Sequence, residues 1–226
     1  MSQSPLSSYC VIFDMDGVLA DTGPIHFESW IKLGNEIGFE FTRDLFEQTF
    51  GQKSLIIIGR LIGSGVDRTL IEEYANRKEY YYRQMVMDKL KPLPGAIEII
   101  KDLKCEGFKL ALGSSGPPEN VDLLLKSLKI KKCFDVMITA TEVEKGKPEP
   151  DVFLIAAKAL NINPENCIVI EDAPVGITAA KSAGMLSIAL TTTHRREELF
   201  NADLIIKNLS EISIADIKRL LNINQN

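Results

Sequence analysis

The chain has 226 residues, of which 45% are hydrophobic and 25% charged, a balance typical of one soluble globular domain or of a domain with a small insert. Its formal net charge of −5 argues against a nucleic-acid or anionic-membrane partner. Four cysteines without metal-ligand spacing favour a reduced, cytoplasmic environment. We expect no secretory signal, no membrane span and a monomer.

The sequence opens and closes with short polar segments, residues 1–8 and 222–226, and we expect both to be frayed. Between them, short apolar runs alternate with segments of helical period. The first apolar run, Tyr9–Asp14, is typical of a strand that is buried on both faces. We therefore expect the first strand of the chain to lie in the interior of the sheet.

A long interval without a convincing strand follows, from about Pro24 to Leu90. Prolines at positions 92 and 94 mark its end. We therefore predict a small helical insert, residues 22–91, within a main domain made of residues 1–21 and 92–226. The helices predicted inside the insert are Ile25–Ile37, Asp44–Phe50, Leu55–Ile62 and a long one near Thr69–Lys89.

Strands and helices alternate regularly in the rest of the chain, which predicts an α/β fold with a parallel sheet covered on both faces. The predicted helices are Gly95–Glu106, Pro118–Leu128, Asp151–Leu160 and Pro174–Ala183. The predicted strands are Phe108–Ser115, Phe134–Ala140, Asn166–Asp172 and Leu186–Thr192, with Ala202–Asn208 as a weaker edge strand.

Polar side chains follow these predicted strands at the sheet edge where α/β proteins bind ligands. Each pattern alone is equally consistent with a turn or a helix cap, but their occurrence after four different strands favours a site. Four acids against one lysine require a cation, and hard oxygen ligands suit Mg²⁺. The residues, in strand order, are Asp14 and Asp16, then Ser114 and Ser115, then Lys147, then Glu171 and Asp172.

Four segments, FDMDGVLADT, LGSS, KGKPEPDVF and IEDAPVGITAAKSAG, resemble the signature motifs of the haloacid dehalogenase superfamily and occur in its order. The resemblance spans Tyr9 to Asn208. It is strongest to the subgroup of small sugar-phosphate phosphatases and β-phosphoglucomutase. It implies a Rossmann-like, three-layer α/β core with a small all-helical cap domain inserted after the first strand.

The resemblance also implies catalytic roles. Asp14 would attack phosphorus and form an aspartyl phosphate that water hydrolyses. Asp16 would protonate the leaving oxygen and later deprotonate water. Asp16 would then start protonated, and we expect a neighbouring carboxylate to raise its pKa. Lys147 and Ser114, with its neighbour Ser115, would hold the phosphoryl oxygens.

In the same way, the resemblance implies that Mg²⁺ is held by Asp14, Asp172 and the backbone carbonyl of Asp16, with Glu171 either a ligand or a supporting residue. Gly17 would let the backbone approach the site closely. Other candidates are weaker.

His26, on the first cap helix, is either a structural or a functional histidine. Lys53, in the segment GQKS, is either a substrate-binding residue of the cap or a solvated lysine.

The leading hypothesis is a phosphatase that hydrolyses a small phosphorylated metabolite such as a sugar phosphate. A β-phosphoglucomutase-type mutase is the first alternative, but that subgroup usually carries an arginine in the cap loop, where only Lys53 precedes Arg60 here. A pyrophosphatase is a further alternative. Asp16 argues against a dehalogenase, and the complete set of motif residues argues against a non-catalytic binding module.

Overall fold

The computed structural model describes residues 5–63, 65–87 and 89–223. Six strands form one sheet in the order β3-β2-β1-β4-β5-β6, and every neighbouring pair is parallel. The first strand in the chain is therefore central, and the predicted edge strand is at an edge. The strands are β1 (Cys10–Phe13), β2 (Lys109–Gly113), β3 (Val136–Ile138), β4 (Cys167–Glu171), β5 (Leu186–Leu190) and β6 (Leu204–Ile206).

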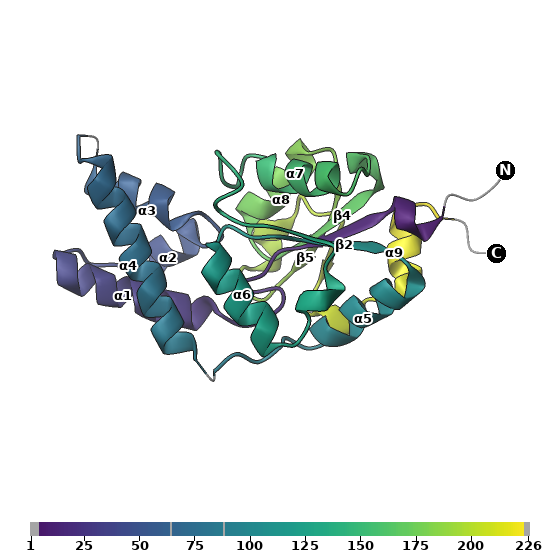
Figure 1. Cartoon of the computed structure of the whole chain (residues 1–226), viewed down its shortest axis with the longest axis horizontal. Coiled ribbons are helices and arrows are strands. Elements are labelled where there is room, and N and C mark those ends of the chain that lie inside the picture. The colour runs from purple at the N-terminus through teal and green to yellow at the C-terminus, as the bar shows by residue number, and fades with distance from the viewer. Residues whose placement is uncertain (1–4, 64, 88, 224–226) are drawn as a thin grey trace.

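Helices cover both faces of the sheet (Figure 1). Helices α5 (Ala96–Glu106), α6 (Pro118–Ser127) and α9 (Ile214–Leu220) lie on one face, and α7 (Asp151–Ala159) and α8 (Pro174–Ser182) lie on the other. Alternate residues of β1 pack against the two helical layers. Val11 and Phe13 contact the core on the first face, and Cys10 and Ile12 contact the core on the second. This burial on both faces explains the continuous apolar run, and it confirms the predicted three-layer α/β fold.

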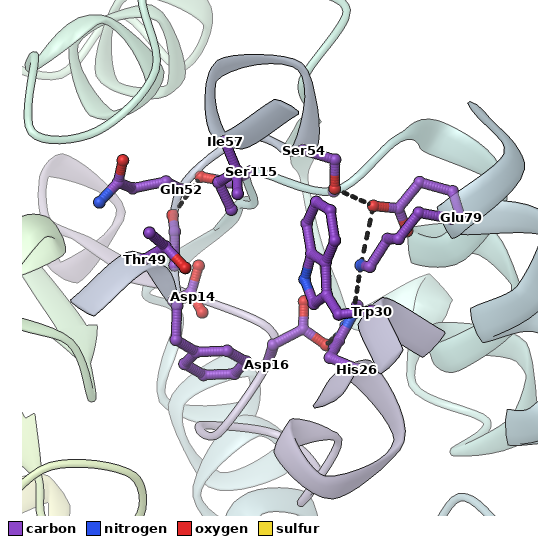
Figure 2. A pocket seen from close by; sticks show the side chains of 14 residues that line it. Asp14, Asp16, His26, Trp30, Thr49, Gln52, Ser54, Ile57, Glu79 and Ser115 are labelled. Atoms are coloured by element: carbon purple, nitrogen blue, oxygen red, sulfur yellow. Dashed lines mark hydrogen bonds and ion pairs between the residues drawn. The ribbon is translucent and has the colours of Figure 1, made fainter. Parts of the chain in front are cut away.

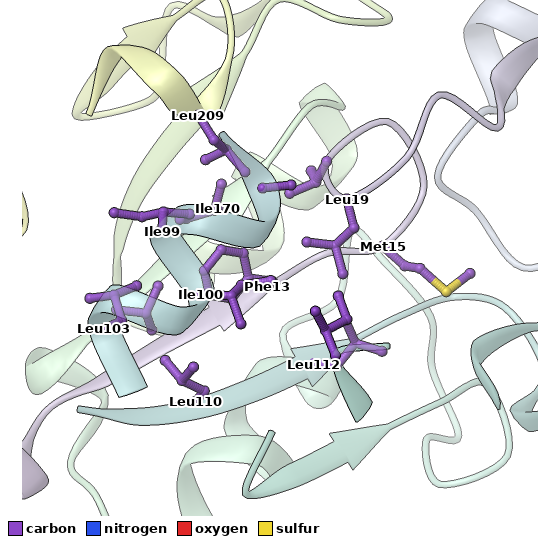
Figure 3. Close-up of a cluster of buried hydrophobic side chains, with 14 of the residues drawn as sticks. Phe13, Met15, Leu19, Ile99, Ile100, Leu103, Leu110, Leu112, Ile170 and Leu209 are labelled. Carbon is purple, nitrogen blue, oxygen red and sulfur yellow. The ribbon is translucent and has the colours of Figure 1, made fainter. Parts of the chain in front are cut away.

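The core beneath α5 fixes the strand from which the site is built (Figure 3). Phe13 of β1 and Leu112 of β2 are fully buried there against Ile100 and Leu103 of α5. Truncating one such side chain to alanine costs about 2–5 kcal/mol of stability. The residue that follows β1, Asp14, is thus carried by one of the best-packed parts of the molecule.

Four helices lie between β1 and α5 in the chain and gather beyond one end of the sheet (Figure 1). They have an apolar cluster of their own, built around Trp30, Leu33 and Phe46. We call residues Gly23–Val86 the helical insert. Its helices, close to the predicted ranges, are α1 (Gly23–Ile37), α2 (Arg43–Thr49), α3 (Ser54–Ile62) and α4 (Arg68–Val86).

The ends of the chain differ from expectation. Leu6–Ser8 form a 3₁₀ turn, and Leu6 and Ile223 pack against the core, so the prediction of fraying was wrong for these residues. Residues 1–4 and 224–226 lie outside the described residues, as does position 88 in the predicted long helix.

Helix α9 was not predicted. In the part of the chain that the structure describes, no helix is both long and apolar enough to cross a bilayer.

Candidate active site

The carboxyl edge of the sheet holds a buried cluster of charged side chains. Lys147 lies at its centre, and its Nζ donates to Asp14 Oδ1 and to Glu171 Oε1, each at 2.5 Å. A third bond, of 3.1 Å, goes to the carbonyl of Gly113 at the end of β2. Asp14 extends β1, because its backbone N–H donates to Ile170 of β4. Three strand ends thus hold one ammonium between two carboxylates.

Positive charge is scarce in this cluster. Burial raises the pKa of Asp14 to about 8, and the repulsion from Glu171 and Asp16 adds to it, although Lys147 acts in the opposite direction. Burial, together with Glu171 and Asp14, also raises the pKa of Asp172 well above its usual value. The carboxylates raise the pKa of Lys147 in turn, against the effect of burial. The site as built favours a bound cation.

The donors present fit a hard divalent cation. Carboxylate oxygens of Asp14, Glu171 and Asp172 all lie within 4.8 Å of one another. Both oxygens of Glu171 accept hydrogen bonds, Oε1 from Lys147 and Oε2 from the backbone N–H groups of Asp172 and Ala173. Asp14 and Asp172 are therefore the carboxylates better suited to bind a metal ion, while Glu171 holds the lysine and the turn in place.

The backbone beside this cluster is shaped for close approach. Gly17 has a φ of +77°, and a β-carbon there would collide with the carboxylate of Asp172. Two threonines after β5 support the same corner: Thr193 donates to the Asp172 carboxylate, and Thr192 Oγ1 donates to the Gly17 carbonyl at 2.5 Å. Sequence reasoning missed both threonines, although they follow a strand end as the predicted residues do.

Asp16 faces the helical insert. Its Oδ1 accepts from Thr22 Oγ1 at 2.6 Å and lies 3.2 Å from His26 Nε2. Lys78 Nζ lies 2.7 Å from His26 Nδ1. An ammonium group only donates, so Nδ1 accepts from Lys78, and Nε2 carries the proton donated to Asp16. The ring also stacks on Tyr82 at 3.9 Å, which fixes its plane.

These contacts correct one expectation. We predicted a raised pKa for Asp16, but it is lowered: burial acts to raise it, and the contact with His26, the Thr22 hydrogen bond and the charge of Lys78 outweigh burial. The neighbouring carboxylate does not dominate, because Asp16 turns away from the Lys147 cluster toward donors of α1 and α4. Asp16 is thus held ionised before a substrate arrives.

A cavity opens between the sheet edge and the insert (Figure 2). Asp14 and Asp16 lie on the sheet side, and Trp30, Ser54 and Glu79 belong to the insert. The cavity combines apolar surface with polar groups that converge on one space, as ligand sites do. The residues around it are Asp14, Asp16, His26, Trp30, Thr49, Phe50, Gly51, Gln52, Ser54, Ile57, Lys78, Glu79, Ser115 and Gly116.

The serines and Lys53 have different surroundings. Ser114 is buried, and its Oγ accepts from the Gly116 N–H at 3.0 Å. Ser115 Oγ donates across to the carbonyl of Gly51 in the insert, at 2.7 Å. The neighbours of Lys53 line the cavity, but Lys53 turns away and its Nζ donates to the carbonyls of Ala140 and Val143, at 2.9 and 2.6 Å.

Fold and site together define a protein of the α/β class, with a buried acidic cluster around one lysine at the sheet edge and a cavity between this edge and a helical insert. The family of haloacid dehalogenase-like hydrolases matches residues 11–190. The chain belongs to this family, as the signature motifs predicted.

The names of several similar proteins refer to phosphorylated carbohydrates. The chain is 36% identical to a β-phosphoglucomutase of Bacillus subtilis, covering 90% of this chain and 91% of that protein. It is 35% identical to a phosphorylated carbohydrates phosphatase of Thermotoga maritima, covering 77% and 81%. Among solved structures, a β-phosphoglucomutase of Clostridium difficile has a TM-score of 0.86 and 30% identity, covering 95% of this chain and 97% of that one.

Proposed function

We propose that the protein is a Mg²⁺-dependent phosphatase that hydrolyses a small phosphorylated carbohydrate, or a similar phosphate monoester, with Asp14 as the nucleophile. One observation carries this proposal: Asp14 lines the cavity, and Lys147 Nζ donates to its carboxylate at 2.5 Å. A fixed carboxylate at the rim of a closed site suits in-line attack on phosphorus.

Asp16 is the proposed proton carrier. It shares the cavity with Asp14, and Thr22 and His26 hold its side chain in one orientation. Its low pKa suits the role of base toward water. The arrival of a dianionic phosphate would raise that pKa, so that Asp16 takes up a proton from solvent and can then donate it to the leaving oxygen. Hydrolysis through an aspartyl phosphate needs both roles in turn.

We assign the metal to Asp14, Asp172 and the backbone carbonyl of Asp16, with Glu171 as support. Mg²⁺, when bound, supplies positive charge that neutralises the phosphate and keeps the two buried aspartates ionised. Ser114 and Lys147 are the proposed phosphate-holding groups. The raised pKa values of Asp14 and Asp172 support this assignment, since they indicate a deficit of positive charge.

We further propose that residues 22–91 form a cap that opens to admit substrate and closes to exclude water. Several contacts hold it against the main domain. They include Lys53 to Ala140 and Val143, Ser115 to Gly51, and His194 Nε2, which lies 3.2 Å from the Glu47 carbonyl. Asn120 of α6 also contacts Arg83 and Glu79 of α4. A cytoplasmic, monomeric enzyme is consistent with this proposal.

The similarity to β-phosphoglucomutases supports a phosphosugar mutase as the second candidate. A mutase has to bind a second phosphate at the far end of its substrate. Lys53, which lies in the cap loop where that subgroup usually carries an arginine, donates to two backbone carbonyls and does not line the cavity. We therefore favour hydrolysis.

A substrate screen tests the choice. Purified protein with Mg²⁺ should release inorganic phosphate from several sugar and polyol monophosphates, without any bisphosphate activator. Conversion of glucose 1-phosphate to glucose 6-phosphate only when glucose 1,6-bisphosphate is added, with no phosphate released, would establish the mutase instead. Asp14→Asn, purified in the same way, should release no phosphate, which would exclude contaminating phosphatases as the source of the activity.

A further inference from the structure

The cavity wall opposite the sheet edge carries a buried carboxylate, Glu79 of α4 (Figure 2). It accepts a hydrogen bond from Ser54 and one of 3.0 Å from Lys78 on Oε1. Its Oε2 accepts from Asn120 Nδ2 at 2.6 Å. Donors from α3, α4 and α6 therefore fix this carboxylate in place. We call Trp30, Ser54, Lys78 and Glu79 the insert wall.

Glu79 is ionised in this setting. Burial acts to raise its pKa, but the charge of Lys78 and the hydrogen bond from Ser54 outweigh burial, so the pKa lies below its usual value. Lys78 is the one lysine among the described residues that line the cavity. Its ammonium group donates to both Glu79 and His26. The insert wall is thus close to neutral, and its one ammonium group is already paired.

The other nearby cations direct their hydrogen bonds to groups outside the insert wall. Lys53 Nζ donates to Ala140 and Val143. Arg60 Nη1 donates to Gln52 Oε1 at 2.8 Å, and Arg83 Nη1 donates to Asn120 Oδ1 at 2.9 Å. Among the described residues that line the cavity there is no arginine. None of these three side chains is among the described residues that line the cavity. A phosphate at this end would face the Glu79 carboxylate, with Lys78 already paired to it.

The same wall is well suited to an uncharged polyol. A carboxylate offers about four acceptor positions, and three of those on Glu79 are occupied, so one can accept from a hydroxyl group. The hydroxyl of Ser54 keeps acceptor capacity after donating to Glu79. Trp30 and Ile57 supply the apolar surface that the carbon face of a sugar covers.

We propose that Glu79 is a specificity-determining residue that accepts a hydrogen bond from a hydroxyl of the substrate and repels any second phosphate. The substrate class is then a monophosphate of a neutral sugar or polyol, and bisphosphates are rejected. This inference rests on the proposed phosphatase function and adds the chemical nature of the leaving group to it.

The test compares substrates that differ at one end. The measured quantity is kcat/KM for fructose 6-phosphate relative to fructose 1,6-bisphosphate, and for glucitol 6-phosphate relative to hexyl phosphate, which has the chain but no hydroxyl groups. The wild-type protein should favour the monophosphate by about tenfold or more, because like charges brought together without a counterion are strongly disfavoured. It should favour glucitol 6-phosphate over hexyl phosphate to a similar extent, because buried polar groups reject a ligand that leaves them unpaired.

The variant Glu79→Gln removes the charge and keeps the shape. Both ratios should fall several-fold in this variant, since ratios within one protein cancel any loss that all substrates share. Glu72→Gln, which removes a half-buried carboxylate that pairs with Arg68 on the same helix and does not line the cavity, should leave both ratios unchanged. Equal losses for all four substrates in Glu79→Gln would make Glu79 a structural support of Lys78 and overturn the proposal.

The wild-type panel keeps the proposal testable if Glu79→Gln does not fold. Equal hydrolysis of the monophosphate and the bisphosphate would overturn the inference and leave the phosphatase function standing. No phosphate release from any of the four compounds, with turnover of glucose 1-phosphate dependent on a bisphosphate, would overturn the proposed function itself.

Discussion

The sheet edge and the insert wall both bury charged groups, but they balance them differently. At the sheet edge, Lys147 faces Asp14, Glu171 and Asp172, and two of these carboxyls have raised pKa values. On the insert wall, Lys78 is shared between the Glu79 carboxylate and the His26 ring, and the carboxyl of Glu79 has a lowered pKa.

Burying ions costs free energy unless they are well paired, so the two regions have different consequences for the fold. The insert wall resolves its charges internally and is ready for a neutral ligand. The sheet edge leaves carboxyl groups that either bind a proton or need an added cation. The comparison supports the proposal that the phosphate and the metal bind at the sheet edge, and the uncharged part of the substrate at the insert wall.

The largest effect is expected at the sheet edge. Asp14→Asn removes the nucleophile and should lower kcat by about a thousandfold or more, because no other group can form the covalent bond. Circular dichroism should show an intact fold. Asp102→Asn, an exposed change on α5, serves as the control and should retain full activity. Residual activity above about one per cent, without deamidation back to aspartate, would remove Asp14 from the role proposed here.

Metal removal should have the next largest effect. Chelation should lower kcat/KM by about a hundredfold or more, since a bound cation supplies several kcal/mol of charge stabilisation. Mg²⁺ should restore activity, and Ca²⁺ should restore it poorly because its coordination is larger and looser. Mg²⁺ should also raise the Tm of the wild type and not that of Asp172→Asn. Full activity in metal-free buffer would break the comparison between the two regions.

A smaller effect is expected where the insert meets the main domain. Lys53→Met keeps the aliphatic chain and removes the bonds to Ala140 and Val143, each of which involves a charged donor. The closed state should lose stability, and KM should rise by about tenfold for sugar phosphates and aryl phosphates alike. The exposed Lys91→Met is the control. A change in preference between the two substrate types would place Lys53 in the substrate site, which is one of the two alternatives that the sequence left open.

The smallest effect concerns stability without metal. The pKa of Asp14 is raised from an ordinary value of 3.8 to about 8, so the folded state binds a proton that the unfolded state has lost. Stability should therefore fall as the pH rises from about 4 to 8 and level off above it. The Tm of the metal-free wild type, compared with that of Asp14→Asn across this range, isolates the effect, and saturating Mg²⁺ should flatten it. A difference in Tm that stays constant with pH would contradict the charge deficit.

Residues at strand ends were accessible from the sequence because a parallel sheet brings its carboxyl ends to one edge. Asp14, Lys147, Glu171 and Asp172 were placed together on that basis, and the structure brings them into contact. The three-layer fold could also be predicted from the sequence, because strands that are buried on both faces, such as β1, appear as continuous apolar runs.

Residues on the helical insert were not accessible in this way. Lys78 and Glu79 occupy adjacent positions on a long polar helix, and only the packing of α4 against α1 and α3 brings them to the cavity. The direction of Lys53 depends on carbonyls 87 and 90 residues away in the chain. The low pKa of Asp16 likewise depends on α1 and α4, so proximity to Asp14 in the sequence gave the wrong direction.

The central claim is that Asp14 carries the phosphoryl group, and trapping that group tests it most directly. The Mg²⁺-loaded protein would be mixed with a good sugar monophosphate, quenched in acid within its first turnovers, digested and analysed by mass spectrometry. We expect the mass of one phosphoryl group on the peptide that contains Asp14, lost on treatment with neutral hydroxylamine and absent from Asp14→Asn. Phosphate release by the wild type with no modified peptide, or with the group on another residue, would contradict the account.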